Sequence, residues 1–473
     1  MSTTLEVQEA NLKRDPRRWF VLAVMSVGTL IVFLDTTVMN TALPNISTEL
    51  RASTSNLQWV LDSYVLVLAG LLMLGGSIGD RYGRRNWMTI GLIIFGAGSV
   101  FGALASNIEQ LIVARGVQGL GAALVLPATL SILTNVFDRD ERPKAIAIWT
   151  AVGGLGIGLG PAVGGYLVDR WDWSAAFWVH VPVIVAALIG QIFVPESRDP
   201  RNIGLDIKGA FSATFGITAL VFGIIQGSEA GWTSPQIVGS FALAAVLLVT
   251  FAQVERTAEY PMLPLHFFKQ KDFTGGVLVL GLAFFSAIVM FFFLVQYFQL
   301  IQGRSPFETG LMVLPNAGAI VVAAGIAQWA LPKFGPRSIV SIGVSIMALG
   351  VVLFTTVDIG TSALSSIVYI MVFGFGFGLA SQPLTDTVMA AVPVEDAGIG
   401  SAVNDVSREL GSALGIAILG SIVSSFYRSN IESELDGQVP DELIEMAGEG
   451  LGVLGVASQE LEPDVAATLV SAA

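Results

Sequence analysis

FTGGVLVLGLAFFSAIVMFFFLVQYFQLIQG, residues 273–303, runs for more than the length of a membrane span without one charged side chain. About 20 consecutive, mostly apolar residues are enough for an α-helix to cross the hydrocarbon core of a bilayer. The whole chain of 473 residues is 53% hydrophobic and only 13% charged. Because soluble domains carry about 25% charged residues, this composition argues against a soluble enzyme and predicts an all-α polytopic membrane protein.

Apolar stretches of this kind recur along the chain. We expect thirteen membrane spans, at residues 19–43, 57–79, 87–106, 110–135, 145–168, 175–194, 209–227, 236–254, 274–300, 309–331, 338–357, 363–385 and 404–427. Very few charges lie inside them. Apart from Asp405 at the very start of the last span, they are Asp35, Asp62, Arg115, Arg408 and Glu409. A charge within a span is expensive unless it is paired or functional, so these five residues are the first candidates for a site.

Lysine and arginine are distributed unevenly between the two sets of predicted loops. If the N-terminus lies in the cytoplasm, most of the basic residues fall in inner segments. The outer segments then hold only Arg51, Arg170, Arg304 and Arg428. The positive-inside rule therefore predicts a cytoplasmic N-terminus.

The composition also removes several classes of chemistry. There is no cysteine, and the two histidines, His180 and His266, are far apart in the sequence, so we expect no disulfide, thiol catalysis or metal site. No phosphate-binding loop or nucleotide fingerprint is present, so we expect no cofactor and no ATP-driven pump. The formal net charge of −13 comes largely from residues 428–473, an acidic segment predicted outside the membrane. It says little about a substrate, and we expect no nucleic-acid partner.

The sequence repeats itself loosely at an offset of about 252–255 residues. Tyr82-Gly83-Arg84-Arg85 matches Phe334-Gly335-Pro336-Arg337, and glycines match in register over two successive spans of each half. Two related helical bundles around a central site are the layout of a secondary transporter. We predict an N-terminal bundle at 1–195, a two-helix insertion at 196–270, a C-terminal bundle at 271–427 and an acidic outer segment at 428–473.

Four local patterns resemble those of the major facilitator superfamily, in particular its 14-span drug:proton antiporters and the branch of quaternary-ammonium exporters. They are LDTTVMNTALP (34–44), GDRYGRR (79–85), RGVQGLGAA (115–123) and GIGLGPAVGG (156–165), and SAVNDVSRELGSALG (401–415) adds a C-terminal match. The resemblance implies two pseudo-symmetric six-helix bundles with two extra inserted helices. It implies a cytoplasmic gating motif at Gly79, Asp80, Arg81, Gly83, Arg84 and Arg85, and an antiporter helix motif at Gly156, Gly160, Pro161, Gly164 and Gly165.

The sequence departs from that pattern in two places. The family commonly has an Arg and then an Asn after the loop between spans 5 and 6, where this chain has Ser174, Ala175 and His180. We expect His180 to form an interhelical hydrogen bond. The family also has a fourteenth span, and with thirteen visible here we expect that span to be missing from the sequence.

The charges in the N-terminal spans reach similar depths in the membrane. At 1.5 Å per residue, Asp35, Arg115 and Asp62 lie about 12, 9 and 7 Å below the outer ends of their helices. This permits an Asp35–Arg115 pair that a proton could break while a cationic substrate competes for the carboxylate. The alternative is a permanent ion pair that only locks two helices together. For Asp62, a functional role and a position at the interface are both open.

The C-terminal span carries its own charged group. Asp405 lies three residues before Arg408, a helical spacing that could close a local ion pair. Glu409 is then the spare carboxylate for protons or substrate, unless it only solvates the start of its helix.

The remaining candidates have both a functional and a structural interpretation. The carboxylate and arginines of GDRYGRR could latch one conformation, or could act only as a topology signal. The glycines of GIGLGPAVGG allow close helix packing, and Pro161 bends the helix. Phe292, Gln296 and Tyr297 could contact a flat cation, although such a run more often faces lipid or another helix.

Together these features predict a proton-coupled multidrug efflux antiporter, not an enzyme, that exports hydrophobic and cationic small molecules by alternating access. One alternative is an exporter of an endogenous lipid or cell-envelope precursor, and another is a membrane sensor or scaffold without transport. The resemblance implies a monomer in the bacterial cytoplasmic (inner) membrane, with protons and the lipid bilayer as its other partners.

Overall fold

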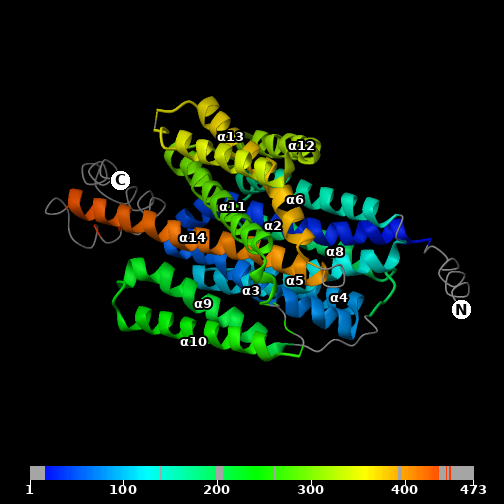
Figure 1. The fold of residues 1–473 in the computed structure, drawn as a ribbon. Coiled ribbons are helices and arrows are strands. Elements are labelled where there is room, and N and C mark those ends of the chain that lie inside the picture. The colour runs from blue at the N-terminus through cyan, green and yellow to red at the C-terminus, as the bar shows by residue number, and fades with distance from the viewer. Residues whose placement is uncertain are drawn as a thin grey trace, which may run out of the picture.

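The computed structural model describes residues 16–138, 141–198, 206–259, 261, 263, 265–358, 360–392, 397–435, 444, 447 and 448. Over these residues the chain consists of helices joined by short connections, with no strand (Figure 1). The helices of the first half are α2 (Arg18–Glu49), α3 (Thr54–Tyr82), α4 (Arg84–Ala103), α5 (Ile108–Val136), α6 (Arg142–Arg170), α7 (Ala175–Trp178) and α8 (His180–Gln191).

The second half continues in the same style. Its helices are α9 (Ile207–Ala230), α10 (Pro235–Thr257), the 3-10 turn η1 (Phe267–Lys269), α11 (Lys271–Gln296), the π-helical turn η2 (Tyr297–Ile301), α12 (Pro306–Phe354), α13 (Ala363–Ala390) and α14 (Ala397–Leu435). The expected all-α membrane fold is therefore confirmed. The particular number of thirteen spans stays a prediction.

Ten helices among the described residues are long and apolar enough to cross a membrane. The predicted spans 309–331 and 338–357 are the two helical stretches of α12, which meet at a kink where Gly335 adopts a non-helical φ of 74° and ψ of 160°. Only glycine adopts that conformation readily, so this residue separates the two stretches. The predicted span 175–194 contains two shorter helices, α7 and α8, which adjoin at Val179.

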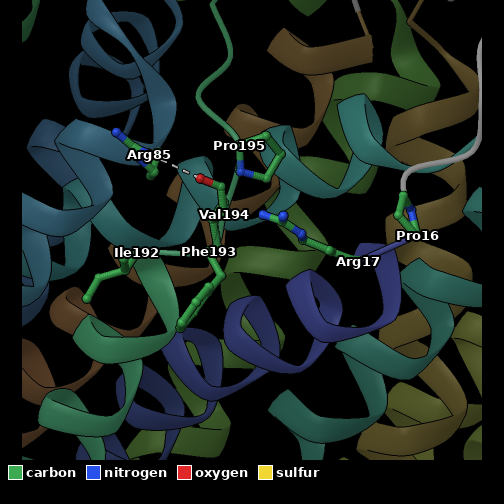
Figure 2. A pocket seen from close by; sticks show the side chains of 7 residues that line it. All are labelled: Pro16, Arg17, Arg85, Ile192, Phe193, Val194 and Pro195. Carbon is green, nitrogen blue, oxygen red and sulfur yellow. Dashed lines mark hydrogen bonds between the residues drawn. The ribbon is translucent and has the colours of Figure 1, made fainter.

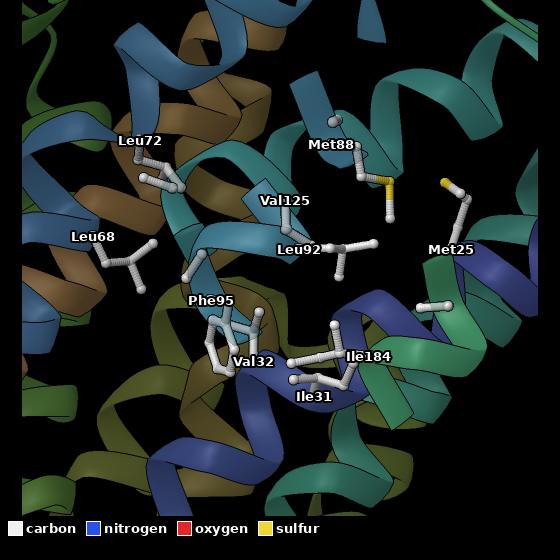
Figure 3. Close-up of a cluster of buried hydrophobic side chains, with 14 of the residues drawn as sticks. Met25, Ile31, Val32, Leu68, Leu72, Met88, Leu92, Phe95, Val125 and Ile184 are labelled. Carbon is white, nitrogen blue, oxygen red and sulfur yellow. The ribbon is translucent and has the colours of Figure 1, made fainter. Parts of the chain in front are cut away.

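The N-terminal helices enclose a continuous apolar core, part of which is drawn in Figure 3. Met25, Leu92, Phe95 and Val125 come from three helices, α2, α4 and α5, and all are almost fully buried. Small residues let these helices approach closely, because a Cβ at Gly121 would strike the backbone of α4 at Phe95 and Gly91.

The C-terminal helices pack among themselves in the same manner. A Cβ at Gly411 of α14 would strike the carbonyl of Gly281 in α11, and one at Gly376 of α13 would strike the backbone of α12 at Gly343 and Met347. Figure 1 shows α9 and α10 side by side at one edge of the molecule. α9 contacts α14, where Ser421 Oγ donates to the Ile224 carbonyl at 3.0 Å. The inserted pair thus lies beside the helical body. The domain limits stay predictions.

Candidate functional site

The polar centre of the N-terminal half is an ion pair between Asp35 of α2 and Arg115 of α5. Arg115 Nη1 donates to both carboxylate oxygens of Asp35, at 2.7 and 2.9 Å, and the two residues are 0% and 1% exposed. Arg115 Nε also donates to the Val60 carbonyl of α3 at 3.1 Å. The pair therefore ties three helices together in an apolar interior, where breaking it leaves an uncompensated charge.

Further polar side chains surround this pair, and we call Asp35, Arg115, Gln118, Ser99 and His180 the buried polar cluster. Gln118 Oε1 accepts from Arg115 Nη1 at 2.7 Å, while Gln118 Nε2 donates to Ser99 Oγ at 2.9 Å and to Asp35 Oδ1 at 3.3 Å. His180 Nε2 lies 3.6 Å from Asp35 Oδ1, and its Nδ1 lies 3.5 Å from Ser99 Oγ. All five are buried.

Tyr64 of α3 covers one face of the arginine, whose guanidinium carbon lies 4.3 Å from the ring centroid. This is a cation–π arrangement between two buried side chains, and such contacts are stronger there than at an exposed site. Both side chains are almost fully buried, so this contact helps to hold the Arg115 guanidinium in place.

Asp62 is placed differently from Asp35. It is fully buried in α3, and within the described part of the chain neither of its carboxylate oxygens has a hydrogen-bond partner. An unpaired carboxylate buried among apolar helices costs free energy that the fold must supply elsewhere. Whether Asp62 lies near the membrane interface stays a prediction.

The charged group of α14 is less completely buried than the Asp35–Arg115 pair. Arg408 Nη1 lies 3.6 Å from Asp405 Oδ1, with the two side chains 26% and 45% exposed. The guanidinium carbon of Arg408 also lies 4.5 Å from the Phe284 ring centroid in α11. Glu409 is partly exposed and interacts electrostatically with both neighbours.

The 79–85 loop, GDRYGRR, makes its contacts with residues of the N-terminal half of the molecule. Arg84 Nε donates to Asp80 Oδ1 at 2.6 Å, and the Arg81 guanidinium lies 5.5 Å from the Tyr82 ring centroid. Gly83 has a φ of 124°, and a Cβ there would meet the Glu196 carboxylate at 3.0 Å. Gly79 is buried, and its carbonyl accepts from the Gly83 N–H at 2.9 Å.

Glu196, which sequence reasoning did not single out, anchors this loop. Its carboxylate accepts from the backbone N–H groups of Arg85 at 3.1 Å and Asn86 at 3.2 Å, in the first turn of α4. A negative charge at a helix N-terminus satisfies free N–H groups and interacts favourably with the helix dipole.

We expect Glu196→Ala to destabilise the fold by about 1–2 kcal/mol, because two helix N–H groups lose a charged acceptor. Thermal unfolding in detergent micelles measures the change. Glu259→Ala, which removes an exposed carboxylate from a loop, is the control. Equal effects of the two substitutions would contradict the anchoring role.

The glycines of GIGLGPAVGG lie where α6 crosses two other helices. A Cβ at Gly160 would strike the Thr37 hydroxyl of α2, and those at Gly156 and Gly164 would crowd α2 at Leu30 and Val38. On the other side, a Cβ at Gly165 would strike the Pro306 carbonyl of α12.

The crossing of α6 and α12 is reciprocal. A Cβ at Gly310 of α12 would strike the Pro161 carbonyl of α6, so the two backbones touch at both positions. This crossing joins the N-terminal and C-terminal halves. Two hydrogen bonds join them elsewhere, from Gln58 Nε2 to the Ile416 carbonyl at 3.1 Å and from Gln299 Nε2 to the Thr41 carbonyl at 3.1 Å.

We expect Gly165→Val to destabilise this conformation by about 1–3 kcal/mol, because the added side chain forces α6 and α12 apart. Gly154→Val on the same helix is the matched control, since a Cβ there meets nothing within 4 Å.

The readout uses the absence of native cysteine in this chain. A cysteine introduced as Ala42→Cys, at a buried position of α2, should react with a thiol reagent faster when combined with Gly165→Val. It should react at the original rate when combined with Gly154→Val. If the rate is unchanged in both double variants, the α6–α12 crossing does not limit access of the reagent to position 42.

The aromatic stretch of α11 and η2 does not form one surface. Phe292 is fully buried in an apolar cluster with α2 and α3, and Gln296 Nε2 donates to the Phe292 carbonyl at 3.4 Å. Tyr297 Oη donates to the Asp358 carbonyl at 2.9 Å, in the connection after α12. Any contact between these side chains and a substrate stays a prediction.

Buried charges within a body of membrane-spanning helices are what a transporter needs to bind an ion or a polar substrate inside a bilayer. A family model described as Major Facilitator Superfamily matches residues 25–416, and the chain belongs to that superfamily. Its fold and family make it a transporter rather than an enzyme.

Several curated proteins are similar over most of the chain. The multidrug resistance protein Stp of Mycobacterium tuberculosis (strain CDC 1551 / Oshkosh) is 34% identical over 422 residues, which cover 89% of this chain and 78% of that protein. The multidrug efflux pump LfrA of Mycolicibacterium smegmatis is 33% identical over 475 residues, covering 100% and 94%. A puromycin resistance protein of Streptomyces alboniger is 35% identical over 418 residues, covering 86% and 82%.

Solved structures show the same fold. The crystal structure of a bacterial homologue of the human lysosomal transporter Spinster, inward-facing and unoccupied, has a TM-score of 0.66 at 18% identity, covering 97% of this chain and 92% of that one. A D-xylose-proton symporter has a TM-score of 0.59 at 15% identity, covering 93% and 96%. These likenesses confirm the major facilitator fold.

Proposed function

We propose that this protein is a proton-coupled multidrug efflux antiporter, which exports hydrophobic cations in exchange for protons. The observation that carries the proposal is the fully buried Asp35–Arg115 pair within a cluster of polar side chains. The similarity to proteins named as multidrug efflux pumps and resistance proteins supports export of small molecules.

A proton can change the pair because its stability depends on the charge of the carboxylate. When Asp35 accepts a proton, Arg115 loses its counter-ion, and the helices that the pair joins are free to rearrange. A cation that binds the carboxylate competes with both the proton and the arginine. Competition of substrate and proton for one carboxylate is the minimum that antiport requires.

Asp62 and Glu409 supply two more carboxylates. An unpartnered buried carboxylate such as Asp62 is favourable only with a proton or a cation bound, which suits a carrier. Glu409 lies on α14 beside Arg408 and is only partly buried in the protein, so an ion can reach it. We assign proton and substrate binding to these three carboxylates, with Arg115 and Arg408 as their charge partners.

We further propose an inner-membrane monomer with its N-terminus in the cytoplasm. In this orientation the 79–85 motif lies on the cytoplasmic face, where it acts as a latch. The two bundles then alternate in closing the inner and outer sides around the carboxylates.

The test is transport of mono- and dicationic fluorescent dyes by protein reconstituted in liposomes, with and without an imposed proton gradient. We expect the dye to be concentrated against its own gradient only when the proton gradient is imposed, in the direction opposite to the protons. Concentration of dye without a proton gradient, or an equal rate in protein-free liposomes, would contradict proton-coupled cation export. Movement of an anionic lipid precursor but of no dye would instead favour export of an endogenous envelope compound.

A further inference from the structure

A basic recess opens at the end of the N-terminal half where the 79–85 motif lies. Its volume is about 540 Å³, and Figure 2 shows its lining. The lining residues are Pro16, Arg17, Arg85, Ile192, Phe193, Val194 and Pro195. They come from the start of α2, the start of α4 and the chain that follows α8, and the two arginines reach it from different segments.

Arg85 is held in place by two hydrogen bonds. Arg85 Nη1 donates to the Val194 carbonyl at 3.3 Å, and Arg85 Nη2 donates to Asn86 Oδ1 at 3.3 Å. Its side chain is partly buried, whereas that of Arg17 is exposed. A planar guanidinium that is fixed in this way can offer its remaining N–H groups to a phosphate with little loss of side-chain entropy.

A second, apolar cavity of about 310 Å³ adjoins the recess, and Phe193 lines both. The other lining residues are Phe20, Ala23, Val24 and Val27 of α2, and Ala186, Ala187, Ile189 and Gly190 of α8. It therefore forms a groove between two helices. Its floor is close-packed, because a Cβ at Gly190 would strike Val24. Its rim is open, with Phe20, Phe193 and Ile189 between 44% and 57% exposed.

The two cavities together match the two parts of a phospholipid. We propose that this face binds one anionic phospholipid of the adjacent leaflet, with its phosphate between Arg17 and Arg85 and an acyl chain along the α2–α8 groove. Charge complementarity favours an anionic head group, since two arginines, Arg17 and Arg85, are among the described residues that line the recess. Continuity of the apolar groove selects a lipid over a free phosphate.

The position of the site couples lipid binding to the 79–85 loop. The Arg85 and Asn86 N–H groups also hold Glu196, and Val194 is two residues before that anchor. A bound head group would therefore stabilise the same segments that fix the 79–85 loop.

The experiment is native mass spectrometry of the full chain released from detergent, titrated with phosphatidylglycerol or with phosphatidylcholine of the same acyl chains. We expect phosphatidylglycerol to bind more tightly, and Arg17→Gln and Arg85→Gln each to weaken it about fivefold. Arg256→Gln removes an exposed arginine from the last turn of α10, away from the recess lining, and should leave binding unchanged.

The groove is tested separately. Ala186→Trp places a large side chain at the exposed wall of the groove without changing any charge, and we expect it to weaken phosphatidylglycerol binding. Equal binding of the two lipids would overturn the proposal, and so would an Arg256→Gln effect as large as that of Arg17→Gln. Full displacement of the lipid by inorganic phosphate would show that the recess is a free anion site. The thermal unfolding midpoint of each variant without added lipid identifies any that fail to fold.

Discussion

Asp35→Asn should reduce proton-coupled cation transport to the rate of protein-free liposomes. An asparagine side chain neither takes up a proton at this pH nor attracts a cation as an anion does. The proton and the substrate therefore no longer have a carboxylate for which to compete. It also leaves Arg115 buried without its counter-ion, at a cost of about 3–5 kcal/mol in stability. Transport is measured with a fluorescent cation under an imposed proton gradient.

Two further variants separate the roles of charge and packing. Glu49→Gln removes an exposed carboxylate at the end of the same helix and should transport normally. The double substitution Asp35→Asn with Arg115→Gln removes both charges, so it should recover most of the lost stability but no coupled transport. If the double variant transports at the original rate, the pair is only a lock between α2 and α5.

Asp62→Leu should have opposite effects on stability and on transport. Replacing an unpartnered buried carboxylate with an apolar side chain of similar size should stabilise the fold by about 1–3 kcal/mol, because no polar group is then left without a partner. Dye transport should fall sharply, since the carrier loses one of its three carboxylates. Such an exchange of stability for activity is expected at functional sites.

Thermal unfolding and dye transport on the same preparation test this prediction. Ser63→Leu, on the next residue of α3, is the control, because Ser63 donates to the Ile112 carbonyl at 3.1 Å and its loss should destabilise. A destabilised Asp62→Leu protein would mean that the carboxylate has a partner that stabilises the fold. A stabilised protein with full transport would remove Asp62 from the mechanism.

The sequence predicted the helical architecture well because the signal is strong in each span. Long apolar runs have no other favourable state in a bilayer, and each charge inside them stands out against that background. Asp35 and Arg115 were therefore identified as candidates, and their depths permitted the pair that the structure shows. The break between the predicted spans 309–331 and 338–357 is also present, because Gly335 interrupts α12 there with a non-helical conformation.

The other members of the buried polar cluster are not charged residues that stand out in an apolar span. Gln118 lies three residues after Arg115, on the same helix face, so its proximity could have been found from the sequence. Ser99 could not, because serine is common in apolar helices and hydrogen-bonds to its own backbone there. The contacts of His180, Tyr64 and Glu196 depend on which helices are neighbours. Sequence periodicity does not give that information.

The most direct measurement is the proton movement that a substrate causes without any imposed gradient. Liposomes containing the protein and an internal pH-sensitive dye receive a lipophilic cation on the outside, at equal pH on both sides. The account predicts a change of internal pH that depends on the cation, is absent with Asp35→Asn and is retained with Glu49→Gln. Cation uptake with no change of internal pH would contradict proton exchange, and with it the central role of the buried carboxylates.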